Sequence, residues 1–131
     1  MRFMMLLPAT VEGLEKCAVP PAEIVIPMRK YNEELVKAGV LLAAEGLHPT
    51  SKGTRIRISG GKRIVTDGPF TEAKEVIAGF WIIQVKSREE AVEWANRCPL
   101  PECGVIEIRQ VFENSDFPPE LQKGRGSSRM R

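Results

Sequence analysis

One histidine and a few charged residues carry most of the chemistry that this sequence could perform. His48 is the only histidine, so acid or base catalysis by imidazole near neutral pH would have to use it. Asp67 opens the turn sequence DGPF, and a carboxylate beside an imidazole permits general acid/base catalysis. We therefore take His48 and Asp67 as candidate catalytic residues.

Further charged residues could bind a ligand beside them. The candidates are Glu45, Arg55, Glu72 and Lys74. Arg55 and Arg57 are alternatives for holding an anionic substrate, because a guanidinium binds carboxylate or phosphate through paired hydrogen bonds. Each candidate also fits a structural role. A histidine before a proline is typical of an exposed loop, Asp67 fits a turn, and the other charged residues fit solvated faces.

The sequence does not contain the residue patterns of a metal site, a disulfide framework, a phosphate-binding loop or a serine nucleophile motif. Cys17, Cys98 and Cys103 do not match the spacing of a zinc site or a disulfide framework, so we expect reduced thiols. Gly60-Gly61 lacks the spaced glycines and the following helix of a phosphate-binding loop, and no Gly-x-Ser-x-Gly is present. We expect no metal and no cofactor.

The composition is that of one globular domain. The chain has 131 residues, of which 43% are hydrophobic and 27% are charged, which is typical of a single core that needs no metal or disulfide. The apolar run near the start stops at Pro8, too early for a signal sequence or a membrane span. We therefore expect a cytoplasmic protein without a membrane partner.

The positive charge is concentrated near the C-terminus. The formal net charge is +2, and the four cations after residue 122 supply +4, so residues 1–122 carry −2. The sequence KGRGSSRMR has no aromatic residue to stack on a base and no helical periodicity. Nucleic-acid binding is therefore not expected.

Hydrophobic periodicity predicts a mixed α+β order. We expect a strand at 2–7, a helix within 21–38, a strand at 40–47, hairpin strands at 54–59 and 62–66, a strand at 76–85, a helix at 87–98 and a strand at 104–112. Without the hairpin the order is βαββαβ, that of a ferredoxin-like α+β sandwich. Helices cover one face of such a sheet, and a second subunit would cover the other. We therefore expect a homodimer that packs sheet on sheet.

Local signals place the helix ends. Pro27 lies within the first helical pattern, and because proline removes a backbone donor, we favour a helix that starts near Pro27 over one that kinks there. Gly39 suits the left-handed cap that ends this helix. Ser87 and Glu90 predict a capping box at the start of the next long helix, and a short helical turn is expected over 71–75.

The hairpin has the strongest local signal. Gly60-Gly61 tolerates positive φ at both turn positions. Ile56 and Ile58 alternate with arginines, which predicts a strand with one dry and one wet face. Phe80 and Trp81 point to opposite faces of their strand, so one should pack on the helices and the other at the dimer interface.

Three stretches of the sequence resemble one family. They are EELVKAGVLLAAEGLHP, DGPFTEAKEVIAGFWII and SREEAVEWANRCP, and together they resemble the YCII-related family, in particular the branch named for its DGPF motif. The likeness runs from about Arg2 to Val111. It implies a ferredoxin-like fold that dimerises through its sheet as a dimeric α+β barrel. We therefore expect one such domain at 1–113 and an irregular, disordered basic tail at 114–131.

The resemblance brings no settled activity. Members of the YciI type have been proposed to be enzymes because a histidine near the start of the first helix pairs with an acidic residue. Met28 stands at the corresponding position here. A methionine cannot transfer protons, so whether this protein is an enzyme stays open.

Three functions are compatible with the sequence. The first is the binding of a small polar or anionic metabolite in a pocket near the DGPF turn, with weak acid/base catalysis as an option. The second is a non-catalytic interaction or regulatory module, because relatives of this branch are sometimes joined to, or encoded beside, sigma-factor-like transcription proteins. The third, heme or monooxygenase chemistry of the kind that similar dimeric α+β barrels perform, ranks last because the single histidine falls in a loop.

Overall fold

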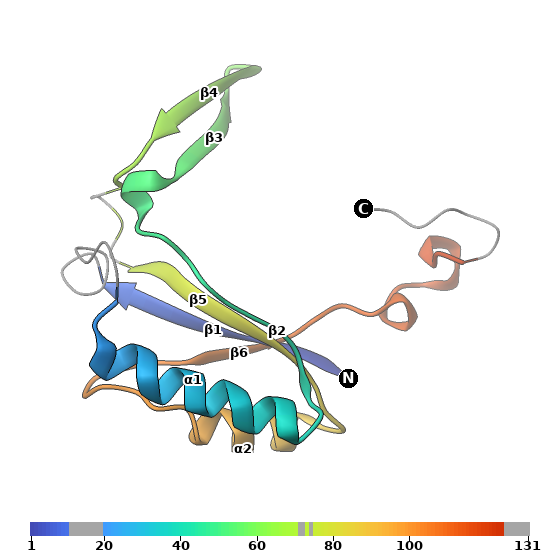
Figure 1. Ribbon diagram of the computed structural model, residues 1–131. Coiled ribbons are helices and arrows are strands. Elements are labelled where there is room, and N and C mark those ends of the chain that lie inside the picture. Colours follow the sequence, from blue (N-terminus) through green and yellow to red (C-terminus); the bar gives the residue numbers. More distant parts are fainter. Residues whose placement is uncertain (11–19, 71–72, 74, 125–131) are drawn as a thin grey trace.

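The computed structural model describes residues 1–10, 20–70, 73 and 75–124 (Figure 1). In chain order its elements, with η for a 3-10 turn, are β1 (Arg2–Thr10), α1 (Ala22–Lys37), β2 (Leu41–Gly46), η2 (Thr50–Lys52), β3 (Thr54–Ser59), β4 (Lys62–Asp67), β5 (Glu75–Gln84), α2 (Arg88–Asn96), β6 (Glu107–Gln110), η3 (Asn114–Asp116) and η4 (Pro119–Leu121). The helical turn expected over 71–75 falls on residues that are mostly outside the described ranges.

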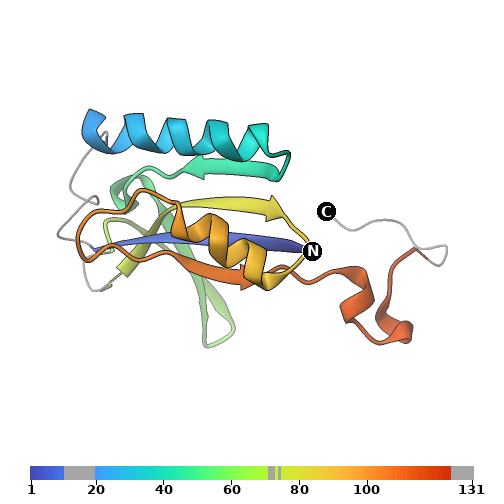
Figure 2. The ribbon, with the colours of Figure 1, turned by 90° about the horizontal axis from the view of Figure 1, so that it is seen from below.

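Four strands form an antiparallel sheet in the order β2-β5-β1-β6. The chain contains two strand-helix-strand units, β1-α1-β2 and β5-α2-β6. In each unit the two strands are separated in the sheet by one strand of the other unit, which is the ferredoxin-like arrangement. Both helices cover one face, which Figure 2 shows from the helix side. The α+β prediction is therefore confirmed. Within the chain the sheet is open, with edges at β2 and β6, and does not close into a barrel.

The core lies between the sheet and the helices. Met5 of β1, Leu35 of α1 and Ile83 of β5 are fully buried there. Trp81 faces the same way and meets the Tyr31 ring edge-on, with ring centroids 5.8 Å apart. The buried Tyr31 hydroxyl donates to the Trp94 carbonyl at 2.6 Å, which ties α1 to α2. Of the two adjacent aromatic residues in β5, Trp81 is thus the one that packs on the helices.

α1 starts earlier than the sequence pattern predicts. It spans Ala22–Lys37 and contains Pro27, so the predicted start near Pro27 is wrong. Proline at this position removes one intrahelical bond, while burial of Tyr31 and Leu35 stabilises the helix through its packing. The C-terminal signal is confirmed, because Gly39 has a φ of +74°.

β1 continues past the point where it was expected to end. The strand runs through Pro8 to Thr10, with a register shift against β5 between Leu7 and Pro8. β6 pairs only with residues 3–6 of β1, so the missing Pro8 donor breaks no bond to β6. The expected stop at Pro8 is therefore wrong.

The predicted capping box of α2 forms in part. The Ser87 hydroxyl accepts a hydrogen bond from the Glu90 N–H at 3.1 Å. The Glu90 carboxylate accepts one from the Lys86 N–H at 3.1 Å, one residue before the expected donor. Two donors at the start of α2 are satisfied in this way.

The hairpin of β3 and β4 stands away from the body (Figure 1). Its turn is the expected one, with φ of 57° at Gly60 and 77° at Gly61. Ile56 pairs with Val65, and these two side chains and Ile58 are each between 61% and 63% exposed. The predicted dry face is therefore wrong, because no described part of the chain covers it.

The residues after β6 form two 3-10 turns held by hydrogen bonds. The Arg2 guanidinium donates to both carboxylate oxygens of Glu113, at 2.8 and 3.0 Å. The Asp116 carboxylate accepts the Glu113 N–H at 2.7 Å, and the Asn114 side chain makes hydrogen bonds of 2.7 and 2.9 Å with the Lys123 backbone. We call residues 111–122 the C-terminal segment.

The ion pair between Arg2 and Glu113 makes stability depend on pH. Hydrogen bonds from Arg2 lower the pKa of Glu113 below its ordinary value of 4.5. A lowered carboxyl pKa contributes stability above the ordinary pKa, and this is lost as pH falls through the lowered value. We expect Arg2→Gln to lower the Tm near neutral pH, and the difference from wild type to shrink below the ordinary Glu113 pKa and to vanish once pH has fallen through the lowered value.

Thermal unfolding followed by circular dichroism across this pH range tests the prediction. Arg109→Gln is the matched control, because Arg109 is an exposed residue of β6. Its Tm difference from wild type should be small and independent of pH. A pH-independent difference for Arg2→Gln would contradict the assigned linkage.

Candidate functional site

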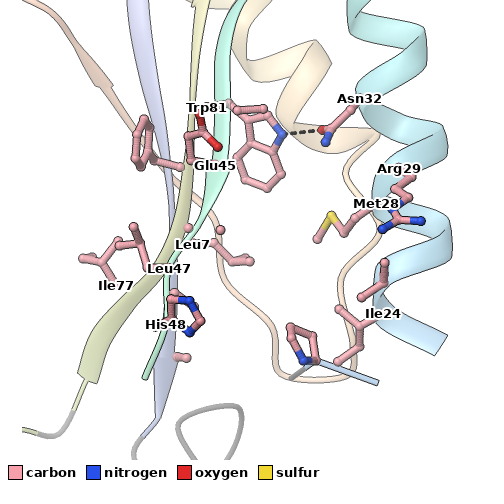
Figure 3. Close-up of a pocket in the computed structure, with 18 of the residues that line it drawn as sticks. Leu7, Ile24, Met28, Arg29, Asn32, Glu45, Leu47, His48, Ile77 and Trp81 are labelled. Atoms are coloured by element: carbon pink, nitrogen blue, oxygen red, sulfur yellow. Dashed lines mark hydrogen bonds between the residues drawn. The ribbon is translucent and has the colours of Figure 1, made fainter. Parts of the chain in front are cut away.

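A cavity of about 450 Å³ lies between α1 and the sheet. Its walls come from β1, α1, β2 and β5 and from the turn 47–49 that follows β2. Figure 3 shows the side chains of α1 facing those of the strands across it. Sites for small molecules have volumes of roughly 300 to 1,000 Å³, so the cavity is large enough for a metabolite.

Most of the lining is apolar. Leu7, Ala44 and Trp81 line the cavity from the sheet, and Ile24 and Met28 line it from α1. Ile24 and Met28 share a face because residues four apart lie one turn apart on a helix. Met28 thus presents a thioether to the cavity. This surface suits an apolar ligand body.

A hydrogen bond joins two walls of the cavity. The Trp81 indole N–H donates to the Asn32 side-chain oxygen at 2.7 Å (Figure 3). The indole can only donate, so it fixes which end of the Asn32 amide points at it. The amide nitrogen of Asn32 is then the end that can donate to a ligand.

Two further donors border the cavity, one from α1 and one from the turn after β2. Arg29 lies one residue after Met28 on the helix, and His48 is the second residue after the end of β2. Figure 3 shows the imidazole on the same side of the strands as α1. Both side chains are exposed, and Arg29 carries a permanent positive charge. Together with Asn32 they form a polar rim that favours an anion or another hydrogen-bond acceptor.

Glu45 and His48 both border the cavity, but their side chains lie on different sides of the sheet. Glu45 pairs with Phe80, while Ala44 pairs with Trp81 on the helix side. Paired residues share a face and successive residues alternate, so the Glu45 carboxylate lies on the face away from α1. Among the described residues, no hydrogen bond joins His48 to a carboxylate. The structure therefore does not place this carboxylate beside the imidazole.

Asp67 and Arg55 lie at the base of the hairpin and do not line the cavity. The Asp67 carboxylate accepts a hydrogen bond from the Thr54 hydroxyl at 3.2 Å. The Arg55 guanidinium lies 3.9 Å from the centroid of the Phe70 ring. The other predicted ligand-binding residues, Glu72 and Lys74, lie outside the described part of the chain.

The DGPF turn packs against η2. The Gly68 N–H donates to the Gly53 carbonyl at 2.9 Å, and the buried Phe70 donates its N–H to the Thr50 hydroxyl at 3.2 Å. The peptide bond between Gly68 and Pro69 is cis. A Cβ atom at position 68 would overlap the Thr50 carbonyl oxygen and lie 2.6 Å from its carbon. Glycine is therefore required here by close backbone approach.

This packing also positions one edge of the cavity. Thr50 follows His48 and Pro49, both of which line the cavity. Gly68 and Phe70 contact Thr50 directly and so hold the turn from which His48 projects. The residues of the DGPF motif do not line the cavity. Through Thr50 they position the turn that carries His48.

Arg29 and Asn32 line the cavity but were not among the predicted site residues. Both are polar residues of the first helical pattern, next to apolar positions such as Ile24 and Met28. Positions 25, 29 and 32 follow the same spacing of four and three as an apolar stripe, and all three line the cavity. Arg29 and Asn32, two polar residues at helical spacing beside an apolar stripe, were the signal available in the sequence.

Other reactive groups lie elsewhere or are suppressed. Burial raises the pKa of the Cys98 thiol to about 11 and also raises the pKa of Tyr31, so neither is ionised near neutral pH. Cys98 and the exposed Cys103 are free thiols, and Cys17 falls outside the described residues. The described residues contain no group of three or more His, Cys, Asp or Glu side chains able to hold a metal ion. None of their helices has the length and apolarity needed to cross a membrane.

Comparison with known proteins identifies the family. The family model of the YCII-related domain matches residues 1–115. An uncharacterised protein of Rhizobium meliloti (strain 1021) is 40% identical over 85 residues, which cover 63% of this chain and 65% of the relative. The match thus spans less than two thirds of that relative's length. Because the family model covers most of the chain, the protein belongs to the YCII-related family, and the resemblance inferred from the sequence is confirmed.

Proposed function

We propose that the protein binds a small anionic molecule with an apolar body in the cavity between α1 and the sheet. The observation that carries this proposal is the lining itself, an apolar cavity of about 450 Å³ bordered by Arg29 and Asn32 of α1 and by His48 of the turn after β2. Binding sites commonly combine apolar walls with a few polar groups that fix orientation. The ligand class is therefore an alkyl or aryl carboxylate, or a phosphate of similar shape.

The polar rim sets the orientation of the bound molecule. Its anionic end would accept hydrogen bonds from the Arg29 guanidinium and the Asn32 amide, while its apolar body lies against Met28 and Trp81. His48 would donate a further hydrogen bond, or transfer a proton to a ligand that carries its own acidic or basic group. Binding needs no acid/base pair within the protein, and it is the function that this geometry supports best.

A homodimer is part of the same proposal. Met4 pairs with Ile82 and Leu6 with Phe80 on the sheet face away from the helices. These apolar side chains are only partly buried, and no described helix covers them. Sheet-on-sheet packing of a second copy would bury them and form the dimeric α+β barrel expected from the sequence. A cytoplasmic location is likewise proposed from the sequence.

A thermal-shift screen with alkyl and aryl carboxylates tests the binding proposal. A ligand at concentrations above its Kd raises the Tm of the protein. We expect Arg29→Gln to weaken the affinity of the best carboxylate about tenfold, because one charged hydrogen bond contributes roughly 1.5 kcal/mol or more. Lys30→Gln is the matched control, because Lys30 is the next residue on α1 and does not line the cavity.

Two results would overturn the proposal. One is that no carboxylate or phosphate of the series raises the Tm of the wild-type protein. The other is that Arg29→Gln and Lys30→Gln reduce the affinity equally, since a general effect of charge on α1 would then explain the loss.

A further inference from the structure

We propose that the hairpin arm of one chain, β3 and β4 at residues 54–67, binds the C-terminal segment of a second copy. The contact would be made twice, once in each direction, across the two-fold axis of the dimer. This inference rests on the proposed homodimer and names the parts that hold it together. Charge complementarity, exposed apolar side chains and placement in the fold support it.

The hairpin arm is cationic and apolar. Its charged residues are Arg55, Arg57, Lys62, Arg63 and Asp67, a net charge of +3. Ile56, Ile58 and Val65 lie on one face of the two-stranded sheet and are mostly exposed. Large apolar side chains grouped on an exposed strand face are costly in water and mark an interaction surface. The partner of this arm should therefore be both acidic and apolar.

The C-terminal segment has the complementary chemistry. Within 111–122 the charged residues are Glu113, Asp116 and Glu120, and Glu113 is already paired with Arg2, so two carboxylates remain to attract the arm, with the cation Lys123 next to them at the end of the segment. Phe112 is 73% exposed and Leu121 is 65% exposed. The rings of Phe112 and Phe117 contact each other with centroids 5.2 Å apart, which forms a small apolar surface.

The two parts join the sheet at opposite ends of its strands. The hairpin arm joins the sheet where β2 ends and β5 begins, at Gly46 and Glu75. The C-terminal segment leaves from β6 beside Arg2, which pairs with Gln84 at the other end of β5. A strand advances about 3.3 Å per residue, so the two ends of β5 are roughly 30 Å apart.

Their placement fits a two-fold dimer. In Figure 1 the arm and the C-terminal segment both stand on the side of the sheet away from α1 and α2, at opposite ends of the strands. A two-fold axis that lies between the stacked sheets and runs across the strands reverses the ends of the partner sheet. The arm of each chain then meets the C-terminal segment of the other, as a reciprocal contact requires.

Charge exchange tests this contact. Arg57→Glu/Lys62→Glu/Arg63→Glu changes the arm from +3 to −3, at three exposed positions. Ser115→Lys/Glu120→Lys changes the C-terminal segment, with Glu113 paired, from −2 to +1. Each variant alone would face like charge in both contacts of its dimer. We expect each to weaken dimerisation at least about tenfold at low salt in sedimentation velocity.

Mixing the two variants should restore the dimer. In the mixed dimer, one contact joins the negative arm to the positive segment, and the other joins the two wild-type partners. Both contacts are then attractive, and the Kd should return to within about threefold of the wild-type value. All changes combined in one chain should also dimerise, which controls for damage to folding.

The outcomes distinguish the C-terminal segment of a second copy from other partners of the arm. Dimers that are unaffected by either variant, or a mixture that is not restored, would overturn the arm contact and leave a dimer held by sheet packing alone. A wild-type protein that stays monomeric would overturn both the arm contact and the proposed homodimer. Retention of a labelled DNA duplex by a monomer, lost in the arm variant, would assign the arm to nucleic acid instead. Ligand binding in the cavity is measured separately, so failure of the contact is not failure of the binding proposal.

Discussion

Gly68→Ala is expected to destabilise the protein by about 3 kcal/mol or more, among the larger effects of single substitutions. The added Cβ would overlap the Thr50 carbonyl oxygen, and backbone on both sides leaves no flexible side chain to move aside. Relief requires displacement of the DGPF turn and loss of the Phe70 contact with Thr50. In thermal unfolding, we expect the Tm to fall by roughly 10 °C.

Gly46→Ala is the matched control for this substitution. Gly46 also lies at the hairpin end of the sheet, but a Cβ there meets nothing within 4 Å. Its effect on the Tm should be small and of either sign, because alanine also restricts the unfolded chain. Equal Tm values for the two variants would show that the close approach at position 68 does not constrain the fold.

Met28→Trp is expected to reduce the affinity for the best carboxylate ligand at least about a hundredfold, a loss of roughly 2.7 kcal/mol. Met28 projects from α1 into the cavity, and the larger indole would occupy space that the ligand body needs. The cavity can accept the added volume without displacement of the core, so the Tm without ligand should change little. Isothermal titration of wild type and variant measures the loss directly.

Val36→Trp controls for the effect of a tryptophan on this helix. Val36 lies on α1 but is 62% exposed and does not line the cavity. Ligand affinity in this variant should equal that of wild type. If Met28→Trp binds the ligand as tightly as Val36→Trp does, the ligand lies outside the cavity.

The sequence predicts the frame of this fold because its signals are local. Gly60 and Gly61 require positive φ for a tight hairpin turn, Gly39 requires it to end a helix, and Ser87 satisfies a helix N-terminus. Each depends on a few neighbouring residues. Such signals separate the strands from the helices and thus determine the βαββαβ order.

The wrong predictions concern the tertiary packing against a segment, which the sequence of that segment does not contain. Alternation in β3 shows that Ile56 and Ile58 share a face, but it does not show that anything covers that face. Pro27 disfavours a helix locally, and distant packing of Tyr31 and Leu35 outweighs it. Tertiary contacts decide both, and no pattern within the segment contains them.

The candidate site was predictable only in part. His48 and Glu45 border the cavity, yet Glu45 lies on the sheet face away from α1 and has no hydrogen bond to His48, which follows the end of the strand. Asp67 was grouped with His48 because a carboxylate beside an imidazole permits acid/base catalysis. The DGPF turn does contact Thr50, near the end of β2, through Gly68 and Phe70, but the Asp67 carboxylate accepts a hydrogen bond from Thr54.

The hydrogen bond between Trp81 and Asn32 gives the cavity an optical readout. The chain has two tryptophans, and the other one, Trp94, lies on α2 beside Arg97 and away from the cavity. A molecule entering the cavity changes the polarity around the Trp81 indole and competes for the amide that binds its N–H. The fluorescence emission of the unmodified protein can therefore report occupancy without a label.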